Sequence, residues 1–284
     1  MKKQILVPID LSENSKAGLS AAIKIAEKSD AVINLMHIIE EESPVYINTT
    51  ADMTLSHEVK NERNRYLAEL TRKKHNELSK FLKPYNPKNL ELKNYIAVGS
   101  YTECMRDMVN QHNIGFIVMS TSGETSVTEF ISGGYTEKTV REAPVPVLSI
   151  KHESNLEKID TLGFLIDLDQ PNEKLIELIN SLTDVLQTEL ILLHMKELEF
   201  LKDNELIVHL RLLAREYGLK PKVIQVINSN YDKLYDLREL IEKHNIDILA
   251  KTVDKQSAIA RLFLRNNSEE LIKEIEKPTL LMAR

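Results

Sequence analysis

The chain has 284 residues, of which 42% are hydrophobic and 28% charged, and its formal net charge is −6. This length fits two domains of roughly 140 residues better than one. The excess of acidic groups argues against a dedicated nucleic-acid-binding protein, because such proteins need a positive field to neutralise phosphates. The single cysteine, Cys104, excludes an internal disulfide and a thiolate metal site.

The amino-terminal stretch does not have the form of a signal peptide, because its apolar run is about five residues long and ends at Pro8 and Asp10. No apolar run in the chain reaches the roughly 18 to 20 residues that a membrane helix needs. We therefore expect a cytoplasmic protein without a membrane partner, whose ligands are small molecules or other proteins.

Short apolar runs rich in β-branched residues alternate with helical patterns through the first half of the chain. The pattern predicts strands at 5–10, 32–39, 92–98, 115–120 and 145–150, and helices at 12–29, 58–82, 101–112 and 135–143. Ser12 is the expected N-cap of the first helix. Nearly continuous apolar strands are typical of a parallel sheet with helices on both faces, which is a doubly wound, Rossmann-like α/β domain.

The second half repeats this alternation. It predicts strands at 163–168, 189–196, 221–227, 247–252 and 278–283, and helices at 172–187, 203–218, 231–245 and 268–276. We therefore predict an α/β fold with two tandem doubly wound domains, at 1–150 and 161–284, joined by a polar linker at 151–160.

An internal repeat supports two copies of one unit. Asp10 aligns with Asp167 and His37 with His194, each pair 157 residues apart. Further along, His112 aligns with His244 and Pro146 with Pro278, each pair 132 residues apart. The difference of 25 residues must be extra length within 40–111. The extra segment at 40–90 is either a lid or partner-binding surface, or an ordinary solvent-exposed insertion without a specific role.

Ligands of such folds bind beyond the carboxyl ends of the strands, where the strand order reverses. Asp10 ends the first predicted strand, where its carboxylate could accept from a ligand or could complement the dipole of the next helix. His37 ends the second strand, and a hydrogen-bonded core histidine is the favoured interpretation. Ser100, after Gly99, is a predicted helix N-cap.

The loop at 120–138, "STSGETSVTEFISGGYTEK", is the most informative segment. Gly123, Gly133 and Gly134 would let backbone N–H groups approach an anion closely, and a predicted helix start follows them. A polar loop without a ligand would have a similar composition, so both interpretations remain open.

These residues resemble the universal stress protein family over nearly the whole chain. The stretches "ILVPIDLSENSKAGLSAAIKIA", "INLMHII", "FIVMSTSG" and "GGYTEKTVREAPVPVLSI" look like its successive landmarks. Nucleotide-binding members carry glycine, two residues, glycine, nine residues, glycine, then serine or threonine. That pattern falls on Ser120, Gly123, Gly133 and Gly134, so two of the four positions match.

The resemblance implies further site residues. Asp10 and Ile38 would flank the adenine and ribose, Ile38 through its backbone, while Met119 and Tyr135 adjoin the loop. In the second half the equivalent loop positions are Thr252, Lys255, Arg265 and Asn266, and none of them is glycine. Nearby lysines and arginines could hold an anion by charge, although a solvated basic face is the commoner explanation. The second domain is therefore predicted to be degenerate.

Three functional hypotheses follow. The favoured one is weak binding of ATP or AMP in the amino-terminal domain, as a stress sensor or regulator. The alternative is a structural or interaction module that binds no nucleotide, and a weak ATPase is more remote, because no catalytic constellation or metal-binding motif is present. Since dimers of the family pair through the last strand, the two domains are expected to form an intramolecular pseudo-dimer, and a homodimer of whole chains remains possible.

Overall fold

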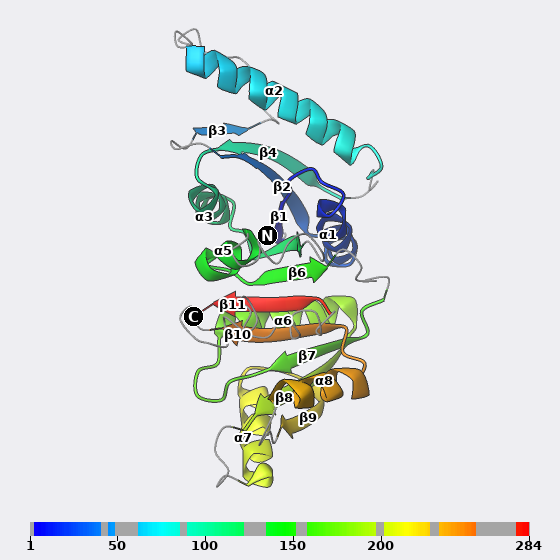
Figure 1. The fold of residues 1–284 in the computed structure, drawn as a ribbon. Helices are drawn as coiled ribbons and strands as arrows, with labels where there is room; N and C mark the ends of the chain where they lie inside the picture. Colours follow the sequence, from blue (N-terminus) through cyan, green and yellow to red (C-terminus); the bar gives the residue numbers. More distant parts are fainter. Residues whose placement is uncertain are drawn as a thin grey trace.

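The computed structural model describes residues 3–40, 45–48, 62–85, 90–121, 135–151, 158–196, 202–227, 233–253 and 277–283. Within this part of the chain, eleven strands form one sheet in the order β3-β4-β2-β1-β5-β6-β11-β10-β7-β8-β9 (Figure 1). The two halves therefore share a single continuous sheet. No helix in the described ranges has the length and apolar character needed to cross a membrane.

The first half contains the predicted elements and one further strand. They are β1 (Gln4–Pro8), α1 (Ser15–Ser29), β2 (Val32–Ile39), β3 (Val45–Asn48), α2 (Glu62–Leu82), β4 (Leu92–Val98), α3 (Tyr101–Gln111), β5 (Phe116–Thr121), α5 (Tyr135–Glu142) and β6 (Val147–Lys151). The edge strand β3, which pairs antiparallel with β4, was not predicted. The helix expected from Ser12 begins at Ser15, and Asn14 occupies the N-cap position.

The second half follows the same plan without a counterpart of β3 among its described residues. Its elements are β7 (Thr161–Leu165), α6 (Glu173–Leu186), β8 (Glu189–Met195), α7 (Asp203–Glu216), β9 (Pro221–Ile227), α8 (Lys233–Lys243), β10 (Ile248–Val253) and β11 (Thr279–Ala283). The predicted helix at 268–276 lies outside the described residues. The extra length of the first half is accounted for in part by β3 and by α2, which has 21 residues against 14 in α7.

Both halves wind in the same order, as the doubly wound prediction requires. Strand β1 lies between β2 and β5, and all of its pairings are parallel. Strand β7 lies in the same way between β8 and β10. In each half the chain first adds strands on one side of the first strand and then crosses to add strands on its other side. This is the tandem doubly wound fold predicted from the sequence.

Backbone conformation repeats with the spacing read from the sequence. Left-handed residues end α1 and α6 at Asp30 (φ 51°) and Gln187 (φ 56°), which are 157 positions apart. Asn113 and Asn245, both with φ 49°, are 132 positions apart and follow α3 and α8. Two copies of one unit therefore share even the unusual backbone turns that connect their helices to the next strands.

The halves meet at an antiparallel pairing of β6 with β11, side by side in the middle of the sheet (Figure 1). Leu148 pairs with Leu280, which is its own equivalent 132 positions later. On either side, Val147 pairs with Leu281 and Ser149 with Thr279. A residue that faces its own equivalent marks a two-fold axis, so the junction has the self-complementary geometry of a symmetric dimer interface. The predicted pseudo-dimer is confirmed.

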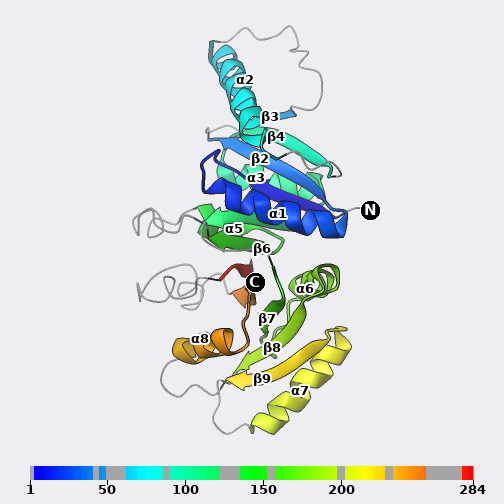
Figure 2. The same ribbon diagram turned by 90° about the vertical axis from the view of Figure 1, so that its right-hand side faces the viewer.

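A single hydrophobic core crosses this junction on one face of the sheet. Buried side chains of α1, α2, α6 and α7 share it with alternate residues of the strands, including Leu148 and Leu280. Helices α1 and α6 contact each other across the junction (Figure 2). On the opposite face, α3 and α5 cover the first half and α8 covers the second. The shared core makes the halves one structural unit.

We expect Leu280→Ala to lower the free energy of unfolding by about 2–5 kcal/mol, because the substitution opens a cavity at the axis, where the leucine is fully buried. Denaturant unfolding followed by circular dichroism measures the change. The matched control is Leu212→Ala on α7, where the side chain is 59% exposed and the expected change is within about 0.5 kcal/mol. Equal losses in the two variants would contradict a core that spans the junction.

Candidate functional site

The strand order of the first half reverses at β1, so the expected ligand crevice lies where β1 and its neighbour β5 end. Asp10 lies two residues after the end of β1, while Met119 and Ser120 are near the end of β5. Ile38 is near the end of β2, which pairs with β1 on its other side. The topology therefore places these four predicted site residues at one end of three adjacent strands.

The carboxylate of Asp10 is fixed through one of its oxygens. Oδ1 accepts hydrogen bonds from the Ser12 N–H at 2.9 Å, from the Ser12 hydroxyl at 2.6 Å and from the Ser15 hydroxyl. Leu11, with φ 67°, adopts the left-handed turn that brings these donors back to the carboxylate. No residue in the described part of the chain donates to Oδ2.

Two effects act on the pKa of Asp10. Burial alone would raise the pKa, but the hydrogen bonds from Ser12 and Ser15 outweigh it, and the pKa of the carboxyl is lowered from its ordinary value. The side chain is therefore ionised at neutral pH and can act only as a hydrogen-bond acceptor. It can receive an N–H or O–H group of a ligand.

The equivalent position in the second half is arranged differently. Asp167 accepts a hydrogen bond from the Asp169 N–H at 3.1 Å. The residue equivalent to Ser15 is Asn172, which caps α6 by accepting from the Leu175 N–H at 3.1 Å. The hydroxyl of Ser15, which donates to Asp10, is thus replaced by the side chain of Asn172, which accepts from the first turn of α6.

Ser120, which stands where the family pattern has its first glycine, is directed at α1. Its hydroxyl accepts a hydrogen bond from the Gly18 N–H at 2.8 Å. A β-carbon added at Gly18 would lie 2.9 Å from both the nitrogen and the Oγ of Ser120, so the close approach of α1 to β5 requires glycine. In the second half the equivalent residues are Leu175 and Thr252, so the glycine is not repeated.

The remaining predicted residues divide between the core and the loop. The side chain of Met119 is buried in the core between the sheet, α3 and α5, and Ile38 packs against the same core. Gly123, Gly133 and Gly134 lie outside the described residues.

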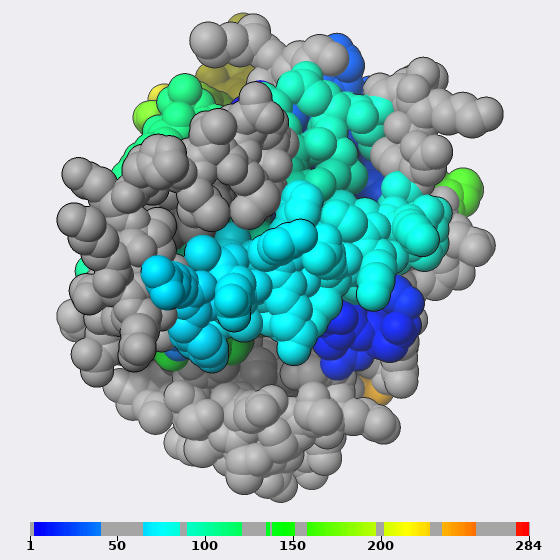
Figure 3. All heavy atoms as spheres, turned by 90° about the horizontal axis from the view of Figure 1, so that it is seen from above, coloured from blue at the N-terminus to red at the C-terminus, as the bar shows by residue number. Residues whose placement is uncertain are grey.

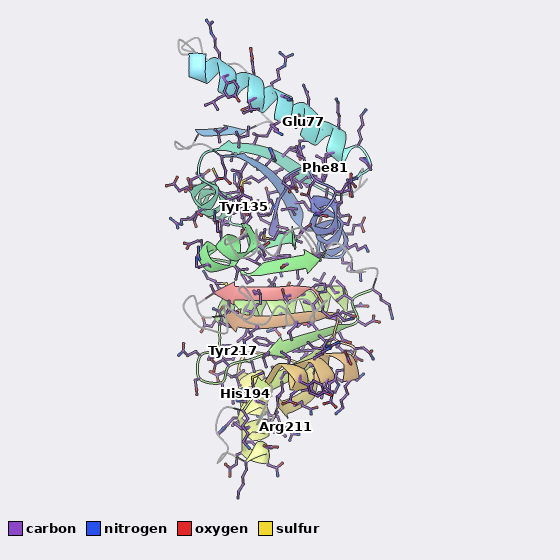
Figure 4. The ribbon with its side chains drawn as sticks, in the orientation of Figure 1. Glu77, Phe81, Tyr135, His194, Arg211 and Tyr217 are labelled. Carbon is purple, nitrogen blue, oxygen red and sulfur yellow. The ribbon has the colours of Figure 1, made fainter. Side chains whose placement is uncertain are left out.

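Tyr135, which is labelled in Figure 4, is the first residue of α5 and belongs to a cluster that the sequence did not predict. Its hydroxyl donates to the carboxylate of Glu40, its ring centroid is 4.5 Å from that of Tyr101, and Lys138 Nζ is 5.6 Å from its centroid. The hydroxyls of Tyr101 and Thr139 are 2.8 Å apart, and burial raises the pKa of Tyr101. The cluster anchors the start of α5 beside the end of β2.

His37 has a structural role, as the sequence favoured. Its Nδ1 is 2.9 Å from the carbonyl oxygen of Ile9, which can only accept, so Nδ1 carries the proton. His194 repeats the contact with Ile166 at 3.1 Å, and the sequence separation is 28 residues in both pairs. Burial lowers the pKa of His37 despite this hydrogen bond, so its ring is neutral at pH 7. The two histidines join the first two strands of each half.

Ser100 occupies the predicted N-cap position of α3, but its side chain makes no capping hydrogen bond. Gly99 precedes it with φ 145°, a conformation that favours glycine, and its N–H donates to the carbonyl oxygen of Ile39 at 2.9 Å. This turn connects β4 to α3.

Comparison with known proteins gives consistent matches. The model of the universal stress protein family matches residues 1–151. A universal stress protein of Methanocaldococcus jannaschii is 24% identical over 161 residues, which cover 55% of this chain and 98% of the relative. The sequence match thus corresponds to about half of the chain and to nearly the whole of the shorter relative.

Solved structures match the full length. A universal stress protein from Archaeoglobus fulgidus superposes with a TM-score of 0.69 and 18% identity, covering 99% of this chain and 96% of its own. A functionally unknown protein from Pseudomonas aeruginosa gives a TM-score of 0.58 at 11% identity, covering 99% and 92%. At this identity the likeness shows a common fold for both halves.

We expect Gly18→Ala to destabilise the chain by about 1–3 kcal/mol, because the new methyl group meets the backbone of Ser120, and this cost exceeds the gain of about 1 kcal/mol in helix propensity. Thermal unfolding measures the effect. The control is Gly115→Ala, where the nearest atom to the new carbon is 3.6 Å away and a change within about 0.5 kcal/mol is expected. A neutral Gly18→Ala would show that the approach is not tight.

We expect the stability difference between the natural chain and Asp10→Ala to depend on pH. The folded-state pKa lies below the ordinary 3.8, so the carboxylate stabilises the folded chain above that value and loses this effect as pH falls through the lowered pKa. Since the side chain is exposed, the difference should be about 1 kcal/mol or less. Urea unfolding between about pH 7 and pH 2 measures it, and a difference that stays constant throughout would contradict the interpretation.

Proposed function

The chain belongs to the universal stress protein family, and from this membership we propose that its amino-terminal half binds an adenine nucleotide, ATP or AMP, and acts as a sensor or regulator in a stress response. The observation that carries the proposal is the carboxylate of Asp10. Three hydrogen bonds hold one of its oxygens at the expected ligand crevice, and no described residue donates to the other.

The geometry suits the nucleoside part of such a ligand. An ionised carboxylate that is already oriented can accept from the amine of adenine or from a ribose hydroxyl without paying to order its own side chain. By resemblance to the family, the backbone of Ile38 would flank the same part of the ligand. The N–H groups of Gly123, Gly133 and Gly134 would receive the phosphates.

The proposal restricts binding to the first half of the chain. Lys251 occupies the position equivalent to Met119, and Thr252 the position equivalent to Ser120, each 132 residues later. No glycine occurs after Gly218, so the second loop cannot repeat a cradle made of glycine backbone. The different partners of Asp167 and Asn172 support the same asymmetry.

We further propose binding without catalysis. The buried ring of His37 is committed to the carbonyl of Ile9, which suits a structural residue better than a proton-transfer group. A second candidate function is an interaction module that binds no nucleotide. It is favoured by Ser120, which stands where the family pattern has glycine and whose hydroxyl accepts a hydrogen bond from Gly18 of α1. Binding measurements distinguish the two candidates.

We expect isothermal titration calorimetry with ATP and AMP, each with and without magnesium, to show saturable binding, with a Kd between about 1 μM and 1 mM. Asp10→Ala should raise the Kd about tenfold, which is the loss of one hydrogen bond to a charged group. The repeat supplies the control, because Asp167→Ala should leave the Kd unchanged within about twofold. No heat at millimolar ligand would favour the interaction module, whereas equal effects of the two variants would contradict a site restricted to the first half.

A further inference from the structure

One face of α2 is strongly basic and open to solvent. Its residues recur every three or four positions and lie opposite the buried Leu78. We call this set the outer face of α2, and it consists of Arg65, Tyr66, Glu69, Arg72, Lys73, Asn76, Glu77, Lys80 and Lys83. Figure 3 shows α2 running across the surface of the molecule.

The cations of the outer face outnumber its acids by five to two. Within the described part of the chain, none of the five cations forms an ion pair. Glu77 is paired at 2.9 Å with Lys74, a cation outside the face, which leaves Glu69 as its unneutralised acid. The side chain of Tyr66 is 61% exposed, and a shallow hollow of about 380 Å³ follows the face between Glu69 and Lys80.

This basic surface contrasts with the rest of the chain. Residues 62–83 contain seven Lys or Arg and three Glu, a net charge of +4, whereas the whole chain carries −6, so the remainder carries −10. The second copy of the unit offers no equivalent. Its shorter helix α7 exposes the apolar Val208 and Leu212 in place of a row of cations.

We propose that the outer face of α2 is a docking surface for an acidic segment of another protein. From Arg65 to Lys83, which directly follows the last residue of α2, the face extends about 27 Å at 1.5 Å per residue. Arg65 and Arg72, and then Lys73 and Lys80, are seven residues apart. This two-turn interval of about 10.5 Å matches the repeat of charged positions along a facing helix. Tyr66 adds the aromatic surface that is enriched at protein interfaces.

The charge distribution favours a short acidic protein segment over a nucleic acid. A duplex lying along about 27 Å would bring roughly 16 phosphates, together with flanking charges that would face the acidic remainder of the chain. An acidic segment confined to the helix avoids that repulsion, and its own cations can pair with Glu69. A second copy with its own α2 against this one is disfavoured, because that arrangement would bring two basic faces together.

The test is fluorescence anisotropy of the full chain with labelled polyglutamate of about 20 residues, which is long enough to cover this face in a helical or an extended conformation. We expect saturable binding that weakens at least about tenfold between about 50 mM and 500 mM NaCl, since exposed charges are screened. The double variant Arg72→Glu with Lys73→Glu should weaken binding by at least about tenfold. The pair Lys80→Glu with Lys83→Glu should act in the same direction.

The matched control is Arg211→Glu with Arg215→Glu on α7, which should change the Kd less than about twofold. Circular dichroism checks that each variant is folded. No binding of polyglutamate, an equal loss in the α7 variant, or tighter binding of single-stranded DNA of the same length would each overturn the proposal. Nucleotide affinity, measured on the same variants, should not change, so the result is independent of the proposed nucleotide site.

Discussion

The antiparallel pairing of β6 with β11 is the constraint on which the rest of the structure depends. Each half alone would end in an apolar edge strand, and such edges tend to be paired or covered. The pairing places Leu148 against its equivalent, Leu280, and joins the cores of both halves into one. Because the partner strand belongs to the same chain, the interface forms at every protein concentration. The sequences of the two copies can therefore diverge while the copies remain paired.

The two copies of the unit share some residues and differ at others. Residues that maintain the unit are kept in both copies, as shown by the contacts of His37 with Ile9 and of His194 with Ile166. The helix starts that follow the first strands differ, since Ser15 holds Asp10 in one copy while Asn172 caps α6 in the other. The structure thus separates the part of the repeat that supports folding from the part that is free to acquire or lose a ligand.

The sequence predicts what local patterns encode and misses what the fold brings together. Strands such as β2 and β8 are nearly continuous apolar runs, and the repeat spacing identifies two copies of one unit, while the pairing of the halves was expected from the family resemblance. Strand β3 is a short edge strand within a polar segment, and its pairing with β4 leaves no periodic signal. The contact between Gly18 and Ser120 spans 102 residues, and the cluster of Tyr135, Tyr101 and Glu40 is equally non-local, so neither could be read from spacing. Asp10 was predicted to be a site residue, but its fixed carboxylate depends on the turn at Leu11.

The central claim is that two copies of one unit share a core while only the amino-terminal copy keeps a ligand site. Mass spectrometry of small molecules released by denaturing the purified full-length chain, with the amount compared to the protein concentration, tests it most directly. The account predicts an adenine nucleotide at no more than one per chain. Two nucleotides per chain, or one that persists when Asp10 is replaced and is lost when Asp167 is replaced, would contradict it.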